Sequence, residues 1–181
     1  MRKRLALALS VATAGSMVVM AAPAGAAQGV TFTITAGALS VSDPADKSLG
    51  SVATGTASIT NTLGNTTVTD NRGALLGTWT SSVSGTDFTT GAGTADETIT
   101  KDNVSYYSGL ATASSGTAVR VPGQATALAA QALSASRTAF SATGVVGNNS
   151  TTWVPTVVVT IPSDSVAGTY SGTITHSVSG A

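Results

Sequence analysis

The sequence of 181 residues contains no cysteine and only one histidine, His176. Without cysteine no disulfide can form, so a chain of this composition must be held together by its hydrophobic core alone. A single imidazole leaves no second histidine to complete a zinc site. These absences exclude disulfide-stabilised scaffolds and argue against a histidine-based metal centre.

Charged residues are also scarce, at 9% of the sequence, with eight Lys and Arg against eight Asp and Glu. Beyond the first four residues no basic stripe exists to displace counterions from phosphate, so nucleic acid is not an expected partner. The low charge does not indicate disorder, because Val, Ile and Leu recur in alternating runs that can bury one face.

The common catalytic signatures are missing as well. The chain has no Gly-x-Ser-x-Gly, no Ser-x-x-Lys and no His-Glu-x-x-His, which are signatures of hydrolases. The segment GAGTAD at residues 91–96 lacks the third glycine and the βαβ context of a dinucleotide-binding loop, and we interpret it as a turn. We therefore predict a protein that is not an enzyme and needs no cofactor.

Carboxylates leave one enzymatic alternative open. The chain offers Glu97 and seven aspartates, most of them in turn-like sequence, whereas sugar hydrolysis needs two acids placed across a cleft. A glycan-active enzyme is therefore the least favoured reading. Asp96, Glu97, Asp102 and Asn103 follow no EF-hand spacing, so we expect a solvated loop there and no metal site.

The N-terminus has the features of a secretory signal peptide. Three basic residues at positions 2–4 precede an apolar run over residues 5–22, and the small residues 24–26 follow it. We expect residues 1–26 to be removed on export, which leaves a single domain over residues 28–181 with a net charge of about −3. The sequence shows no Leu-Pro-x-Thr-Gly sorting signal and no terminal apolar helix, so we expect no transmembrane anchor after signal removal.

Alternating apolar and hydroxylated residues predict a chain built of short strands. Residues 30–35 (VTFTIT) alternate without a break and are expected to form a strand. Residues 43–47 are expected to form a loop, and residues 125–140 a loop or a short helical turn that becomes extended near Arg137. Further strands are expected at 39–42, 52–60, 66–69, 77–83, 98–107, 117–121, 153–162 and 169–178. Seven to nine short strands predict an antiparallel, Ig-like β-sandwich.

The aromatic residues and His176 divide between core and surface candidates. Period two places His176 on the apolar face of the last strand, where we interpret it as a packed core residue. In the pair Tyr106 and Tyr107 only one ring can face the core, and the outward one is the better surface candidate. Trp79 and Trp153 are expected in the core. Exposed rings at any of these four aromatic positions would instead be candidates for binding sugars or partner surfaces.

The last strand resembles the closing strand of WxL-domain surface proteins of Gram-positive bacteria, with the pattern Tyr-x-x-x-Leu-Thr-Trp-x-Leu. The matching positions are Tyr170, Ile174, Thr175, His176 and Val178. Here histidine stands where the family has tryptophan, and we expect its flat ring to occupy the same inward position.

An earlier stretch is similar to the first Trp-x-Leu region of the same family. Residues 68–88 keep the flanking residues of that motif, with Ser81 in place of the leucine; the matching positions are Asp70, Arg72, Gly73, Gly77 and Trp79. The resemblance implies a divergent relative in the style of actinobacteria, with a WxL-like β-sandwich attached non-covalently to the cell wall. The implied partners are peptidoglycan and other cell-surface proteins.

Three classes of function follow. The first is a secreted, non-enzymatic surface protein associated with the cell wall or with other surface proteins. The second is an extracellular structural subunit that self-associates by adding strands at exposed edges. The third, the glycan-active enzyme, would require Glu97 and an aspartate to face each other across a groove.

Overall fold

The computed structural model describes residues 28–181, so the predicted signal peptide lies outside the described part of the chain. The expected all-β class is confirmed. Short 3₁₀ turns occur at η1 (Ala95–Glu97), η2 (Lys101–Asn103) and η3 (Ala127–Ala129). In residues 28–181 no helix has the length and apolar character needed to cross a membrane. The strands are β1 (Leu39–Ser42), β2 (Ser58–Thr62), β3 (Thr66–Gly85), β4 (Phe88–Thr89), β5 (Thr98–Ile99), β6 (Val104–Tyr107), β7 (Ala111–Pro122), β8 (Gln131–Ala132), β9 (Arg137–Trp153), β10 (Thr156–Thr160) and β11 (Ile174–Gly180).

The strand predicted at residues 30–35 is wrong. Residues 28–38 contain no strand, and β1 begins only at Leu39. The side chains of Val30, Phe32 and Ile34 are each more than 80% exposed. A strand requires a neighbouring strand to which its backbone can hydrogen-bond. The alternation of apolar residues and threonine determines only which side chains share a face. The compact unit of the described chain covers residues 35–181.

All sheets are antiparallel. Five strands form one sheet in the order β1-β3-β9-β7, with β11 also paired to β3. Four form a second sheet in the order β2-β10-β6-β8, and β4 pairs with β5. The structure has eleven strands where seven to nine were expected. The additional ones are β4, β5 and β8, which are only two residues long and lie where the sequence predicted loops or parts of longer strands.

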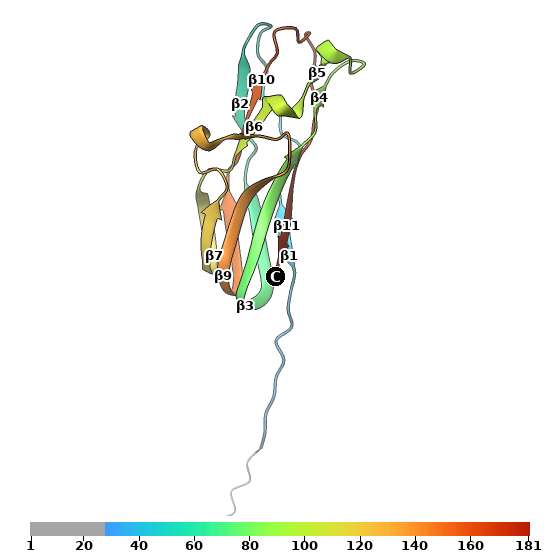
Figure 1. The fold of residues 1–181 in the computed structure, drawn as a ribbon. Helices are drawn as coiled ribbons and strands as arrows, with labels where there is room; N and C mark the ends of the chain where they lie inside the picture. The colour runs from blue at the N-terminus through green and yellow to red at the C-terminus, as the bar shows by residue number, and fades with distance from the viewer. Residues whose placement is uncertain (1–27) are drawn as a thin grey trace, which may run out of the picture. The chain divides into compact units, whose positions relative to one another are not determined.

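The three longest strands fold over on themselves, as the lower part of Figure 1 shows. The register of β3 against β9 shifts between Asp70 and Ala74, and β7 shifts against β9 between Ser115 and Thr117. Gly73 and Gly116 both have φ near +70° at these shifts, a conformation that glycine adopts without steric cost. One hydrogen-bonded sheet therefore supplies strands to both layers of the sandwich.

The second sheet follows the first along the chain where β9 leads directly into β10. Only two residues separate β9 from β10, and the Leu63 amide donates to the Pro155 carbonyl at 2.8 Å, which keeps β2 beside β10. Pro155 stands just before β10, as expected for a residue without an amide donor.

The core lies between the two layers. Its largest fully buried side chains are Trp79, Trp153, Tyr106 and Phe140. The rings of Phe140 and Trp153 stack with centroids 5.0 Å apart. A few large rings thus fill much of the interior, which agrees with the small number of aromatics in the chain.

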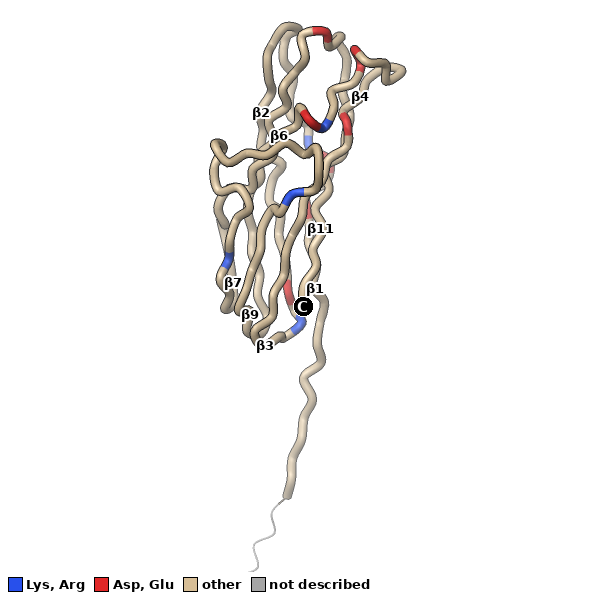
Figure 2. Tube along the Cα trace, in the orientation of Figure 1, with Lys and Arg blue, Asp and Glu red and all other residues tan. Residues whose placement is uncertain are grey.

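Charged side chains are sparse over residues 35–181. Figure 2 shows them spread singly or in small groups rather than gathered in a basic stripe. Most positions of this unit are therefore uncharged.

Candidate functional site

A chain of hydrogen bonds runs from the edge of the sandwich into its core. His176 on β11 places Nδ1 3.0 Å from Asp43 Oδ2 and Nε2 2.9 Å from the hydroxyl of Tyr106 on β6. Trp153 Nε1 donates to the same hydroxyl at 3.3 Å, and Thr66 Oγ1 donates to Asp43 Oδ1 at 2.6 Å. Five strands or their ends are tied together by this network.

A neutral imidazole protonated at Nδ1 satisfies every member of the network. His176 then donates to Asp43 and accepts from Tyr106, whose oxygen accepts from Trp153. Burial acts against the Asp43 carboxylate, but hydrogen bonds from His176 and Thr66 outweigh it and hold the pKa of Asp43 below its ordinary value. Burial also raises the pKa of Tyr106. The phenol therefore stays a neutral donor to the imidazole.

The Asp43–His176 pair has the spacing of a catalytic dyad but not its access. The second imidazole nitrogen is occupied by Tyr106, whose side chain is fully buried. A general base needs that nitrogen within reach of a substrate proton. In this arrangement the pair locks β11 and the segment after β1 onto the core.

Three of the four aromatic surface candidates are core residues. Trp79 is 1% exposed, and Trp153 and Tyr106 have no exposed surface. Their rings present no face to a sugar or to a partner, so the packing interpretation applies to them. Tyr107 points the other way along β6 and is partly exposed. It is the only one of the four that a ligand can reach.

The first motif region builds the turn at which β3 folds over. The buried Asp70 carboxylate accepts from Arg72 Nε at 2.9 Å and Nη2 at 3.0 Å, and Arg72 Nη2 also donates to the Thr78 carbonyl. Beyond the turn, Trp79 Nε1 donates to Asn149 Oδ1 at 3.1 Å. Hydrogen bonding from Arg72 holds the pKa of Asp70 below its ordinary value. Asp70 and Arg72 therefore stabilise the turn within β3 by hydrogen bonds.

The second motif region is the edge strand β11 and the turn before it. As predicted, Ile174, His176 and Val178 face the core while Thr175 is exposed. The Tyr170 hydroxyl donates to the carbonyls of Val166 and Asp96, at 3.0 and 3.1 Å. Tyr170 therefore fastens the preceding loop.

The acidic loop has an internal role as well. Glu97 Oε2 accepts from the amides of Ala92 and Thr94 and from the Thr94 hydroxyl. Across residues 28–181 no three His, Cys, Asp or Glu side chains are grouped closely enough to hold a metal ion. The Glu97 carboxylate therefore holds the loop together by hydrogen bonds within it, which agrees with the interpretation of residues 91–96 as a turn.

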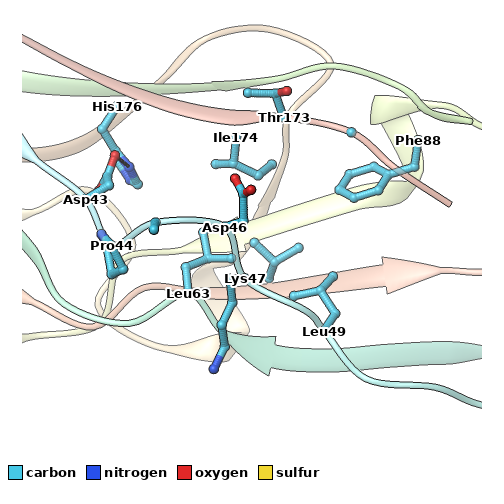
Figure 3. Close-up of a pocket in the computed structure, with 13 residues that line it drawn as sticks. Asp43, Pro44, Asp46, Lys47, Leu49, Leu63, Phe88, Thr173, Ile174 and His176 are labelled. Atoms are coloured by element: carbon cyan, nitrogen blue, oxygen red, sulfur yellow. Dashed lines mark hydrogen bonds and ion pairs between the residues drawn. The ribbon is translucent and has the colours of Figure 1, made fainter. Parts of the chain in front are cut away.

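A hollow opens between the two layers beside Asp43 and His176. It has a volume of about 190 Å³. Figure 3 shows Leu49, Leu63, Ile174 and Phe88 around it, with Asp43 and His176 together at one side. The hydrophobic side chains come from both layers, so the hollow exposes part of the interior.

A larger hollow of about 910 Å³ adjoins the first. Both are lined by Asp46, Lys47, Leu49, Phe88 and Gly172. The apolar part of the larger lining comes from β2 and β10, from β4 and β5, and from nearby loops: Leu49, Val52, Ile59, Phe88, Ile99, Val159, Ile161, Val166 and Tyr170. Its only charged residues are Asp46 and Lys47. We call the two hollows together the groove.

Sequence reasoning did not find the groove. Asp43 was expected only to lie in a loop, yet its partner His176 is 133 residues away in the chain. The apolar lining residues are ordinary inward positions of several strands. Nothing in their local pattern indicates that the layers above them stay apart.

Comparison with protein-family models, with curated proteins and with solved structures found no match to this chain.

Proposed function

We propose that this chain is an exported, non-enzymatic cell-surface module that binds another surface protein through the groove. The single observation that carries the proposal is the groove itself, an open, largely neutral hollow of about 910 Å³ joined to a smaller one. A monomeric domain without a partner tends to cover such apolar surface.

The character of the lining favours a protein over a glycan. Sugar sites place aromatic rings flat against the ligand, but Trp79, Trp153 and Tyr106 are buried. The two rings that line the groove, Phe88 and Tyr170, are only partly exposed. The larger hollow instead offers mainly aliphatic side chains and loop hydroxyls, with one acid, Asp46, and one base, Lys47. Such a surface suits the apolar side chains of a polypeptide.

Two further observations support a surface role without catalysis. The resemblance of residues 68–88 and 170–178 to WxL-domain proteins implies a cell-wall setting with other surface proteins as partners. The Asp43–His176 pair, which could have served as a dyad, is closed off by Tyr106.

Binding to isolated cell walls tests the proposal. The exported chain is mixed with walls of the producing bacterium, either intact or stripped of their proteins by protease. We expect the chain to sediment with intact walls and to stay in the supernatant with stripped walls. Equal sedimentation with stripped walls would identify peptidoglycan as the partner and overturn the protein-partner proposal, and recovery in the supernatant in both cases would overturn wall association.

A matched pair of variants places the binding in the groove. Val52 and Val166 line the larger hollow and are 46% and 43% exposed, so Val52→Arg with Val166→Arg can block it without burying charge. Val119 and Val121 on β7 are exposed and outside the groove, and their double Arg variant is the control. We expect only the groove variant to lose sedimentation with intact walls.

A further inference from the structure

Residues 30–35 carry three large apolar side chains that no other residue of the described range 28–181 covers. Val30, Phe32 and Ile34 are 84%, 86% and 84% exposed, and Thr31, Thr33 and Thr35 alternate with them. No charged residue occurs between positions 28 and 42. The segment therefore has the chemistry of a strand with one apolar face and one hydroxylated face.

The groove has the complementary chemistry. Its apolar side chains come from β2 and β10 on one side and from β4, β5 and β11 on the other, and β2 lies at the edge of its sheet with a neighbour on one side only. An extended segment entering there could add to β2 through its backbone while every second side chain points between the layers. Apolar residues at positions 30, 32 and 34 satisfy that spacing.

The same chain cannot supply this segment to the whole of its own groove. The Gly37 amide is hydrogen-bonded to the Asn71 carbonyl, beside Asp70. Ten residues of nearly continuous strand separate Asn149, opposite Asp70, from Val159, opposite Ile59, a span of roughly 33 Å. Val30 lies seven residues before Gly37 and can extend at most about 25 Å from it. A segment that fills the groove as far as Ile59 must therefore come from another molecule.

We propose that residues 30–35 of one molecule insert as an added strand into the groove of a second copy. Val30, Phe32 and Ile34 would pack toward Ile59, Phe88 and Ile161, and the threonines would stay in water. This inference rests on the proposed function and names the partner protein as a second copy of the chain.

The proposal fixes the type of assembly. The donated segment and the receiving groove are different surfaces, so each molecule in a contact can still donate or receive once more. Such head-to-tail contacts give open chains of molecules unless a rotation closes them into a ring. The expected product is a concentration-dependent series of oligomers.

Sedimentation velocity of the exported chain tests the donor. Phe32→Asp places a charge on the inserted face, and because Phe32 is 86% exposed it leaves the fold unchanged. We expect it to weaken self-association by roughly a hundredfold. Thr33→Asp adds the same charge to the opposite face and should assemble like the unaltered chain.

A mixing experiment tests donor and groove together. The Phe32→Asp variant keeps its groove but lacks a donor, and the Val52→Arg, Val166→Arg variant keeps its donor but lacks a groove. Each alone should remain monomeric, while the mixture should form one-to-one dimers and nothing larger. A mixture that stays monomeric, or single variants that assemble like the unaltered chain, would overturn the inference.

Cysteine pairing checks the contact directly, because the chain has no cysteine of its own. A Phe32→Cys chain and a differently tagged Val166→Cys chain should form a mixed disulfide under mild oxidation. Replacing Val166→Cys by Val119→Cys should abolish it. A strict monomer that still sediments with intact walls would refute the second copy as partner and leave the proposed function standing. Oligomers that do not bind walls would support the second copy as partner and overturn the proposed wall association.

Discussion

Residues 30–35 and 173–178 have almost the same pattern, and the structure treats them in opposite ways. Both alternate large side chains with threonine or serine. In the second segment, β11 pairs with β3 over seven residues and His176 is 8% exposed. In the first, no strand forms and Phe32 is 86% exposed.

The difference shows what an alternating pattern does and does not determine. It sets which side chains share a face, which held for β11. It does not provide the two things that a strand also needs, a neighbouring strand to pair with and an apolar surface to pack on. β11 has both, because it pairs with β3 and because Trp153 and Tyr106 lie beneath His176. The following predictions test this comparison, beginning with the surface on which β11 rests.

Trp153→Ala should have the largest effect. Trp153 is fully buried, stacks on Phe140 and lies against the His176 ring. Its removal leaves a cavity under β11 and should lower the free energy of unfolding by about 3–5 kcal/mol. Urea unfolding followed by circular dichroism measures the change. A loss below about 1 kcal/mol would mean that β11 does not depend on this ring.

His176→Phe should cost less, because a ring still fills the inward position. The phenyl group leaves the Tyr106 hydroxyl without its acceptor and Asp43 Oδ2 without its donor, while Thr66 still donates to Asp43 Oδ1. We expect a loss of about 1–3 kcal/mol in the same urea experiment. Adding Tyr106→Phe removes the stranded hydroxyl, but also the acceptor of Trp153 Nε1. The double variant should therefore lose less stability than the sum of the two single variants. Losses that simply add would indicate that the hydrogen bond between Tyr106 and His176 contributes little.

Asp43 should make stability depend on pH. Its pKa lies below the ordinary value of 3.8 in the folded chain, so the unfolded chain takes up a proton first as pH falls. The stability it contributes is fully present above the unfolded pKa and is lost as pH falls through the folded pKa. Unfolding at several values between about pH 5 and pH 2 should show a shallower decline for Asp43→Asn.

Asp102→Asn is the control for that experiment. It removes the same charge from an exposed position outside the network. The slope of stability against pH should change more for Asp43→Asn than for the control. Equal slopes would contradict a specific role for the contact of Asp43 with His176.

Phe32→Ala should have the smallest effect on the stability of the isolated molecule. The residue has no strand partner, so truncation at low protein concentration should change the free energy of unfolding by less than about 0.5 kcal/mol. The same urea experiment measures it. A loss comparable to that of Trp153→Ala would show that residues 30–35 pack against their own chain in solution.

Much of the fold could be predicted because short-range rules decide it. The inward faces of β11 and of Trp79, Ser81 and Val83 follow from period two. Pro155 stops the ladder before β10 because it has no amide hydrogen. Residues 125–140 lack a helical stripe and form the short turn η3 and the two-residue strand β8.

The candidate site could not be predicted in the same way. The groove joins side chains from distant strands, and Asp43 meets His176 only because β1 and β11 both lie along β3. The fold-over of β3, β7 and β9 could not be predicted either. Single glycines such as Gly73 and Gly116 are common in the sequence, and nothing near them indicates that three strands bend at the same level.

The sequence by itself determined the all-β class, the two faces of each strand and the inward placement of the tryptophans, because these depend on neighbours within a few residues. Only the tertiary structure decided which alternating segment becomes a strand, where the layers stay apart and which partner satisfies His176. Those outcomes depend on edges and surfaces contributed by residues far apart in the chain, and no local pattern contains them.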